Sequence, residues 1–325
     1  MKIRENAAIE LPHVMLLVDD PIDRQKIDGC QGATQEDAVN IAAVKHGIIE
    51  YVYAIKDTLR KLYDTELMQG GGHIRGYAVE GEAAKQVTEA FAAKQNSCGG
   101  FLFAVGDGNH SLATAKTCWE NIKKSGKFTE EQLKTHPARH ALVEICNLHS
   151  EALEFKPIHR LLTNVDVKDM LSFFEAEITK QGLESTEGDE IVFEYVESGS
   201  CDSAKSANGN EVVSENNDGS CTAPIKNSGI NITNRGDRLP VEILQGILDK
   251  YLETHGNVEI DYIHGDEALH GLVKETKGCG IFLQSIDKST LFPAINAGGV
   301  LPRKTFSIGE ANEKRYYMEC HKISM

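Results

Sequence analysis

The sequence predicts a mixed α/β (α+β) protein with two domains. Short apolar runs bounded by turn residues, such as Phe101–Val105, are typical of strands buried in a sheet. Apolar residues spaced by three or four positions, as in 41–62, are typical of helices with one face against a core. At 325 residues the chain exceeds the usual size of one domain. The composition changes near Asp166, so we expect a first domain over 1–165 and a second α+β domain over 166–325.

The first half is expected to begin with a buried strand, His13–Val18, which ends at Asp19-Asp20-Pro21 because proline lacks the N–H that a sheet requires. A long core-facing helix is then expected over 41–62, with Gly47 as a position that bends or weakens it. A dimerising coiled coil is the less favoured interpretation, because fewer than four heptads are present. Further elements follow in order: a strand at 74–79, a helix at 81–94, a central strand at 101–105, a helix at 112–122 and a second central strand at 141–146.

The second half contains a polar insertion among otherwise regular elements. Residues 197–229 are rich in Ser, Asn, Gly, Asp and Glu, so we expect a mobile loop or a hairpin insertion there. Pro240 suits the first turn of a helix over 240–253. The other expected elements are a helix at 170–179, strands at 191–196, 258–263 and 280–283, and the ending 315–319.

The overall composition excludes several kinds of partner. A net charge of −15 argues against a nucleic-acid surface and against binding to an anionic membrane, although a small anion needs only a local group of donors. No apolar run approaches the roughly 20 residues of a membrane span, and Met1–Asn6 lacks the apolar stretch of a signal peptide. The eight cysteines are scattered and form no CxxC pair, which favours reduced thiols over a Cys201–Cys221 disulfide. We therefore expect a cytoplasmic protein.

The strongest functional signal is the turn Gly106–Ser111, which joins the apolar run 101–105 directly to a helix. A helix start has free N–H groups and a partial positive charge, so it attracts anions. Gly106 and Gly108 allow a close approach of the backbone and positive φ, and Ser111 suits the N-cap. Within this turn, Asp107 is the candidate metal ligand or acceptor of a hydroxyl proton, and His110 the candidate phosphate donor or acid/base.

Other interpretations of this turn remain open. Asp107 and Asn109 also suit a tight turn in which each side chain binds its own backbone. A dinucleotide-binding fingerprint is disfavoured, because Ser111 stands in place of its third glycine. A phosphate-binding Walker A loop is absent, because Gly126-Lys127 is followed by Phe128.

Three further segments carry residues suited to phosphate. Gly71 and Gly72 lie in a glycine-rich turn next to His73 and Arg75, where the alternative is a flexible connector. Two short basic turns are expected in the remainder of the chain, and a solvated surface turn is the alternative for each. Their candidate residues are His159 and Arg160 in the first, and Arg303 and Lys304 in the second.

The turn and its surroundings resemble a known family. Residues 106–115 resemble the Asp-Gly-His-His-Arg box of a large, mostly uncharacterised bacterial and archaeal family that includes free serine kinases and belongs to the ParB/sulfiredoxin-like superfamily. Further segments match the family in the expected order, and most of the chain is covered apart from about 24–60 and 197–229. These segments are 11–16, 68–73, 136–145, 157–160 and 301–306.

This resemblance implies a ParB/sulfiredoxin-like first domain, nucleotide phosphate binding and phosphoryl transfer to free serine. Asp107 and His110 match the functional aspartate and second histidine of the box, while Asn109 replaces its first histidine. Ser111 replaces its arginine, which removes a bidentate phosphate donor. Family members also begin with a segment upstream of Leu11 that contributes a catalytic acid, so the chain is expected to be a fragment, a truncation or a partner-dependent subunit.

The leading hypothesis is a small-molecule kinase or phosphotransferase that uses ATP or ADP with Mg²⁺, the metal being held by Asp107. Its partners would be a nucleotide and a small hydroxyl-bearing metabolite, without nucleic acid or membrane, and a homo-oligomer is compatible with the sequence. Gly106, Gly108, Asn109 and Ser111 would bind phosphate. The alternative is a nucleotide- or phosphate-binding regulatory or interaction module without turnover, which the replacement of arginine by Ser111 favours.

Overall fold

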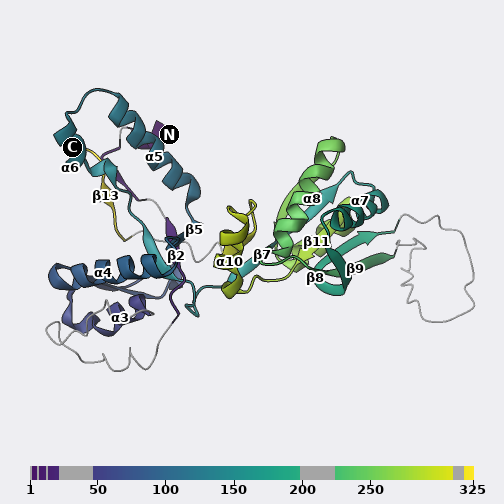
Figure 1. The fold of residues 1–325 in the computed structure, drawn as a ribbon, viewed down its shortest axis with the longest axis horizontal. Helices are drawn as coiled ribbons and strands as arrows, with labels where there is room; N and C mark the ends of the chain where they lie inside the picture. Colours follow the sequence, from purple (N-terminus) through teal and green to yellow (C-terminus); the bar gives the residue numbers. More distant parts are fainter. Residues whose placement is uncertain (1, 6, 12–13, 22–46, 198–223, 310–317) are drawn as a thin grey trace, which may run out of the picture. The chain divides into compact units, whose positions relative to one another are not determined.

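The computed structural model describes residues 2–5, 7–11, 14–21, 47–197, 224–309 and 318–325. It confirms the mixed α/β class, because helices and several sheets alternate along the chain (Figure 1). The chain divides into two compact units: residues 1–154 together with 308–325, and residues 155–307. The predicted domain boundary at 165 lies between a strand and a helix of the second unit. None of the described helices is long and apolar enough to span a bilayer.

The first unit is built on a three-stranded sheet with β2 (Met15–Val18) in the middle. β5 (Phe103–Asp107) pairs with it antiparallel on one side, and β6 (Glu144–Asn147) pairs with it parallel on the other. The two runs predicted as central strands are therefore its flanking strands, and that prediction was wrong for the described residues. An apolar run reports burial but not the order of strands. Leu17 and Val18 are fully buried, whereas most of β5 is half-buried.

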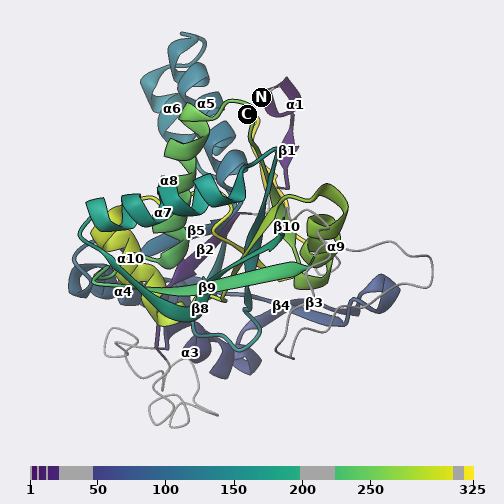
Figure 2. The ribbon, with the colours of Figure 1, turned by 90° about the vertical axis from the view of Figure 1, so that its right-hand side faces the viewer.

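The first unit also contains helices and a separate hairpin. α3 (Ile48–Ala54) and α4 (Gly81–Ser97) form a small core around Ile48, Tyr51 and Ala90. Figure 2 shows the hairpin of β3 (Arg60–Glu66) and β4 (His73–Ala78) as a separate pair of strands. The remaining elements of the unit are α1 (Lys2–Glu5), β1 (Ile9–Glu10), η2 (Lys56–Thr58), η3 (Met68–Gly70), α5 (Asn109–Lys124), α6 (Glu130–Thr135), η4 (Pro137–Arg139) and β13 (His321–Lys322).

The helix predicted over 41–62 is shorter in the structure. Residues 41–46 lie outside the described part, Gly47 adopts a left-handed φ of 81° as the N-cap, and α3 ends at Ala54. Arg60–Leu62 belong to β3 instead, where they pair with β4. The helical spacing continued by chance into a strand, and pairing with a segment further along the chain decided the conformation.

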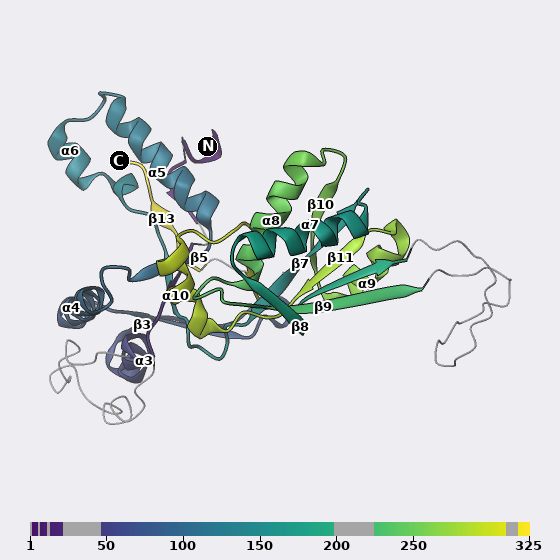
Figure 3. The same cartoon turned by 45° about the vertical axis from the view of Figure 1, so that its right-hand side comes forward.

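The second unit is an antiparallel sheet with helices on both faces. Its strand order is β10 (Glu259–His264), β7 (Phe155–Thr163), β11 (Cys279–Leu283), β8 (Glu184–Val196) and β9 (Ile225–Thr233), and β12 (Phe306–Ile308) also pairs with β7. The helices are α7 (Val167–Lys180), α8 (Pro240–Thr254), α9 (Asp266–Thr276) and α10 (Lys288–Gly298). Leu162 packs in the large core with α7 and α8, whereas its neighbour Leu161 packs with α9, so these helices cover opposite faces (Figure 3).

Two segments expected in this half fall partly or wholly outside the described residues. Residues 198–223 of the predicted insertion lie outside them, and residues 225–229 form the first half of β9, which pairs with β8. Residues 315–317 of the predicted ending also lie outside them. The helix predicted from Pro240 is confirmed as α8, with the proline in its first turn.

Acid is expected to destabilise the second unit through His159, which is 1% exposed. Its Nδ1 accepts the N–H of Leu283 at 3.2 Å, so Nε2 carries the proton and donates to Asp266 at 2.8 Å. Burial lowers the pKa of His159, although Asp266 opposes that shift. The unfolded chain, with a histidine pKa of about 6.5, therefore takes up this proton more readily. The contribution of His159 to stability is present above about pH 6.5 and is lost as the pH falls below it.

The amide signal of Leu283 in NMR spectra, together with the melting temperature from pH 8 to pH 5, measures this effect. His159→Gln should flatten the pH dependence of the melting temperature, whereas the exposed His140→Gln should leave it unchanged. If the melting temperature of His159→Gln fell with pH as steeply as that of the wild type, other groups would be responsible for the acid sensitivity.

Candidate functional site

The predicted site is the junction of β5 and α5, where the chain passes from a strand into a helix within two residues. Asp107 is the last residue of β5 and lies opposite Met15 at the start of β2. α5 begins at Asn109 and runs for 16 residues. The junction therefore lies at the end of the sheet where β2 begins.

Gly108 is the N-cap of α5, and the prediction of Ser111 as N-cap was wrong. Gly108 adopts a left-handed φ of 88°, which glycine tolerates without strain, and no side chain caps the helix. Asp107 Oδ1 accepts the N–H of Gly108 at 2.7 Å. The chain thus enters α5 three residues earlier than expected, and Ser111 lies in the first turn. Its N–H is one of those that a helix start leaves without a partner.

The first turn of α5 presents backbone donors to solvent. The first backbone bond of the helix runs from Leu112 N to Gly108 O at 3.0 Å. Asn109, His110 and Ser111 are exposed, and within the described part of the chain their N–H groups have no acceptor. Three unpaired N–H groups and the helix dipole together favour an anion at this position.

Gly106 serves packing rather than positive φ, because it has no left-handed φ. A Cβ at this position would lie 2.9 Å from Leu17 Cγ and 3.0 Å from Ile308 Cδ1. Leu17 is fully buried and Ile308 is 8% exposed, so neither can move away easily. The glycine lets β5 lie close against this core.

Gly106→Ala is therefore expected to destabilise the first unit by about 1–3 kcal/mol through overpacking. Trp119, the only tryptophan of the chain, lies in α5 and reports the unfolding of this unit by fluorescence in urea. Gly246→Ala in α8 is the control, since a Cβ there meets nothing within 4 Å. An unchanged midpoint for Gly106→Ala would mean that the strand can shift to make room.

The glycine-rich turn predicted as a phosphate site is the tip of the β3–β4 hairpin. Gly72 adopts a φ of 85°, and its carbonyl accepts the N–H of Leu67 at 2.7 Å, whereas Gly71 N donates to Met68 O at 3.1 Å. These contacts close the loop, so the glycines account for its geometry.

The two basic residues beside this turn bind carboxylates of the same hairpin. His73 contacts Glu66 at 2.6 Å and Asp64 at 2.5 Å, and Arg75 Nε donates to Asp64 at 3.2 Å. Glu66 and Asp64 raise the pKa of His73. A phosphate would have to displace these carboxylates from His73 and Arg75.

His159 and Arg160 lie inside β7 of the second unit, so the prediction of a basic turn was wrong. Arg160 is fully buried, donates from Nε to Gln245 at 3.2 Å and lies 5.0 Å from the ring centre of Tyr262. Burial lowers its pKa to about 10. No local pattern indicated this burial, because each residue is polar and the strand is recognised only from the strands that pair with it in the sheet.

Arg303 and Lys304 lie in an exposed turn of the second unit before β12. Lys304 adopts a φ of 59°, and the hydroxyl of Thr305 donates to Pro302 O at 2.7 Å. Both cations are open to solvent, as the sequence predicted for a turn.

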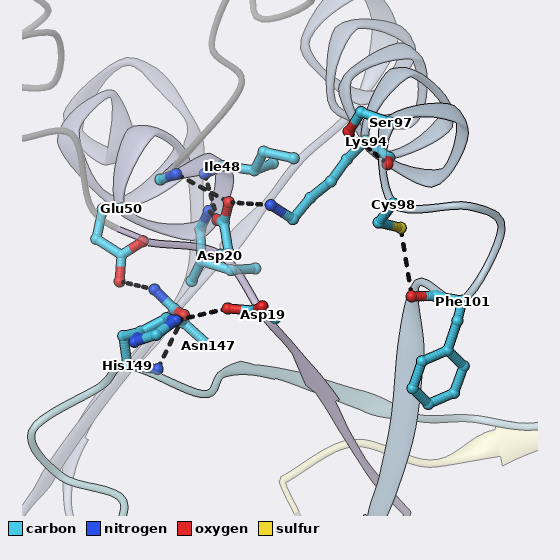
Figure 4. A network of polar contacts seen from close by, with 12 residues as sticks. Asp19, Asp20, Ile48, Glu50, Lys94, Ser97, Cys98, Phe101, Asn147 and His149 are labelled. Atoms are coloured by element: carbon cyan, nitrogen blue, oxygen red, sulfur yellow. Dashed lines mark hydrogen bonds and ion pairs between the residues drawn. The ribbon is translucent and has the colours of Figure 1, made fainter. Parts of the chain in front are cut away.

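A second polar network lies at the carboxyl ends of β2 and β6 (Figure 4). Asp19 accepts a hydrogen bond from His149 Nε2 at 2.6 Å, and both side chains are partly exposed. The N–H of His149 donates to Asn147 Oδ1 at 3.1 Å, and Asn147 Nδ2 donates to Glu50 at 2.8 Å. Two carboxylates at a strand end were the only sequence signal for this group. The parallel pairing of β6 with β2 brings in Asn147 and His149, and Glu50 comes from α3.

The described residues contain no group of three or more His, Cys, Asp or Glu side chains arranged to hold a metal ion. Asp107 supplies one carboxylate at the junction. Mg²⁺ often uses one or two carboxylates, with water and the phosphates of a nucleotide as its other ligands. The residues at the junction therefore fit Mg²⁺ that arrives with a nucleotide and do not form an all-protein metal site.

A family model described as "Protein of unknown function (DUF1015)" matches residues 1–220. The chain belongs to this family. The matched region includes the junction of β5 and α5 and extends into the second unit. No curated protein matches the chain.

Solved structures similar to this DUF1015 protein include a free serine kinase in complex with AMP, with 10% identity, a TM-score of 0.36, and coverage of 98% of this chain and 95% of that chain. A mutant free serine kinase in complex with ADP gives the same values. A conserved hypothetical protein from Pyrococcus furiosus has 14% identity and a TM-score of 0.36 over 65% of this chain and 71% of that chain. Similarity at this level does not transfer an activity to this chain.

Proposed function

We propose that the chain is a small-molecule phosphotransferase, which binds the phosphates of ATP or ADP at the start of α5 and transfers one phosphoryl group to a hydroxyl of a small metabolite such as an amino acid. The observation that carries the proposal is the first turn of α5, where the N–H groups of Asn109, His110 and Ser111 are open beside Asp107. The sequence of this turn also resembles the box of the free serine kinases. The ParB/sulfiredoxin-like relationship, the cytoplasmic location and a homo-oligomeric state belong to the same proposal.

The backbone would bind and orient the phosphates. Three N–H groups that point out of one helix end can hold non-bridging oxygens without any movement of the protein, and the helix dipole adds to the attraction. Because Gly108 has no side chain, this residue does not block the approach of a phosphate to these N–H groups. His110, on the same exposed turn, would donate to a phosphate oxygen.

Asp107 would accept the proton of the acceptor hydroxyl or coordinate the metal ion. In the transfer step the acceptor oxygen forms a bond to the terminal phosphorus, and the bond from that phosphorus to the bridging oxygen breaks. The proton of the acceptor hydroxyl passes to the Asp107 carboxylate. Mg²⁺, when bound with the nucleotide, neutralises phosphate charge, and Asp107 is the carboxylate at the junction that would hold it.

A binding module without turnover is the second candidate, and Ser111 favours it. The arginine of the family box offers a planar, charged donor to a phosphate, whereas a serine hydroxyl offers one neutral hydrogen bond. Loss of this charge weakens the neutralisation on which phosphoryl transfer depends.

The deciding experiment is incubation of the full chain with ATP or ADP, Mg²⁺ and a pool of free amino acids, followed by mass spectrometry for a phosphorylated product. Product that disappears in His110→Ala but persists in the exposed control His140→Ala supports the enzyme. Nucleotide-dependent thermal stabilisation without product supports the binding module. Neither product nor stabilisation with either nucleotide would refute both.

A further inference from the structure

The second unit contains a cleft that the proposed phosphotransferase site does not use. Its volume is about 470 Å³, within the range of small-molecule sites. One wall is the turn 233–237 after β9, and the other is the first two turns of α10. Pro293 is exposed and adds apolar surface, whereas Ile232 at the base of the turn is 3% exposed and belongs to the large core.

The wall after β9 is fixed in place by Arg235, the one cation among the described residues that line the cleft. Its Nε donates to Ile232 O at 3.2 Å, and Nη1 donates to Arg238 O at 2.6 Å. Its Nη2 donates to Glu190 of β8 at 3.0 Å. All three guanidinium nitrogens are thus directed at protein acceptors. Arg235 holds the turn in shape, and its charge is balanced by Glu190.

The hydroxyls that line the cleft also donate to the protein. Ser289 Oγ donates to Asp287 Oδ1 at 2.8 Å, and Thr290 Oγ1 donates to Asp287 O at 2.8 Å. Thr233 Oγ1 donates to Glu184 O at 3.4 Å. Each hydroxyl proton is therefore directed away from a ligand. The three oxygens keep lone pairs that can accept hydrogen bonds from one.

Pro293 and Asp237 strengthen this acceptor character. Pro293 lies inside α10 and has no N–H, so the carbonyl of Ser289 lacks the donor that a helix normally provides four residues later. Asp237 is exposed and forms no ion pair within the described part of the chain. Together these groups make a cleft rich in acceptor oxygens, in which Asp237 is the one carboxylate among the described lining residues.

From this arrangement we infer that the cleft binds a small alkylammonium compound. An ammonium group carries a positive charge and three N–H donors, which match one carboxylate and several acceptor oxygens. Its methylene stem would lie against Pro293. An anion is disfavoured, because Arg235 is already engaged and Asp287 already accepts the N–H groups of Ser289 and Thr290 at the start of α10, at 2.9 Å and 3.0 Å. Asp237 would also repel it.

The test uses ¹⁵N-labelled full-length protein titrated with n-butylammonium chloride, with amide shifts of 233–237 and 289–292 as the readout. n-Butanol, which has the same stem without the charge, and tetramethylammonium, which has the charge without N–H donors, serve as comparison ligands. We expect saturable shifts with n-butylammonium and at least about tenfold weaker binding of both comparison ligands.

Two variants separate the contributions of the cleft. Asp237→Asn should weaken n-butylammonium about tenfold, whereas the exposed control Asp261→Asn in β10 should leave it unchanged. Pro293→Ala gives the Ser289 carbonyl its helical partner, so it should weaken binding without unfolding α10. The inference is overturned by the absence of saturable shifts, by equal binding of n-butanol, or by an unchanged affinity in Asp237→Asn. These readouts do not depend on phosphoryl transfer.

Discussion

Replacement of Asp20 by alanine is expected to destabilise the first unit by about 3–5 kcal/mol, a larger loss than the one expected for Gly106→Ala. Asp20 is fully buried and accepts the N–H groups of Gly47 at 2.9 Å and Ile48 at 2.5 Å. It also lies 3.4 Å from the ammonium group of Lys94, which is 8% exposed (Figure 4). Asp20→Ala leaves a buried cation without its counter-charge and the start of α3 without its cap. The fluorescence of Trp119 in urea measures the loss.

Two further variants test this explanation. Lys94→Met in the Asp20→Ala background removes the uncompensated charge, so the double variant should be more stable than Asp20→Ala alone. The exposed Asp57→Ala should change the free energy of unfolding by no more than about 0.5 kcal/mol. If Asp20→Ala lowered the free energy of unfolding by less than about 1 kcal/mol, the explanation would be contradicted, because water would then satisfy Lys94 and the start of α3 almost as well as the carboxylate does.

Asp107→Asn is expected to lower kcat for phosphoryl transfer by about 10²- to 10⁴-fold if Asp107 accepts the proton of the acceptor hydroxyl. Asparagine keeps an oxygen that can accept the N–H of Gly108, so the start of α5 should retain its conformation. The phosphates would contact backbone N–H groups, so the Kd of the nucleotide without Mg²⁺ should change little. Steady-state kinetics and calorimetric titration measure the two quantities.

The same variant distinguishes the two roles proposed for Asp107. If the carboxylate holds Mg²⁺, a higher Mg²⁺ concentration should restore part of the rate, whereas a lost proton acceptor is not replaced in this way. The exposed Asp57→Asn is the matched control. If Asp107→Asn kept the wild-type kcat, Asp107 would have no role in the transfer step.

The sequence predicted features that depend on neighbouring residues. The change from strand to helix at 106–111 follows from an apolar run, two glycines and a helical spacing, and α5 begins within that segment. Pro240 marked the start of α8 for the same local reason. The backbone donors at the start of α5 were also predictable, because every helix leaves its first N–H groups without a partner.

Features that depend on distant residues came only from the tertiary structure. The pairing of β2 with both β5 and β6 placed β2 in the middle of its sheet, and burial in β7 made Arg160 part of a core. Asp20 caps a helix that begins 28 residues further along the chain. The acceptor-rich cleft likewise combines the turn after β9 with the start of α10. The physical reason is the same in each case: side-chain period and turn chemistry act over a few residues, whereas strand order, burial and clefts depend on which distant segments pack together.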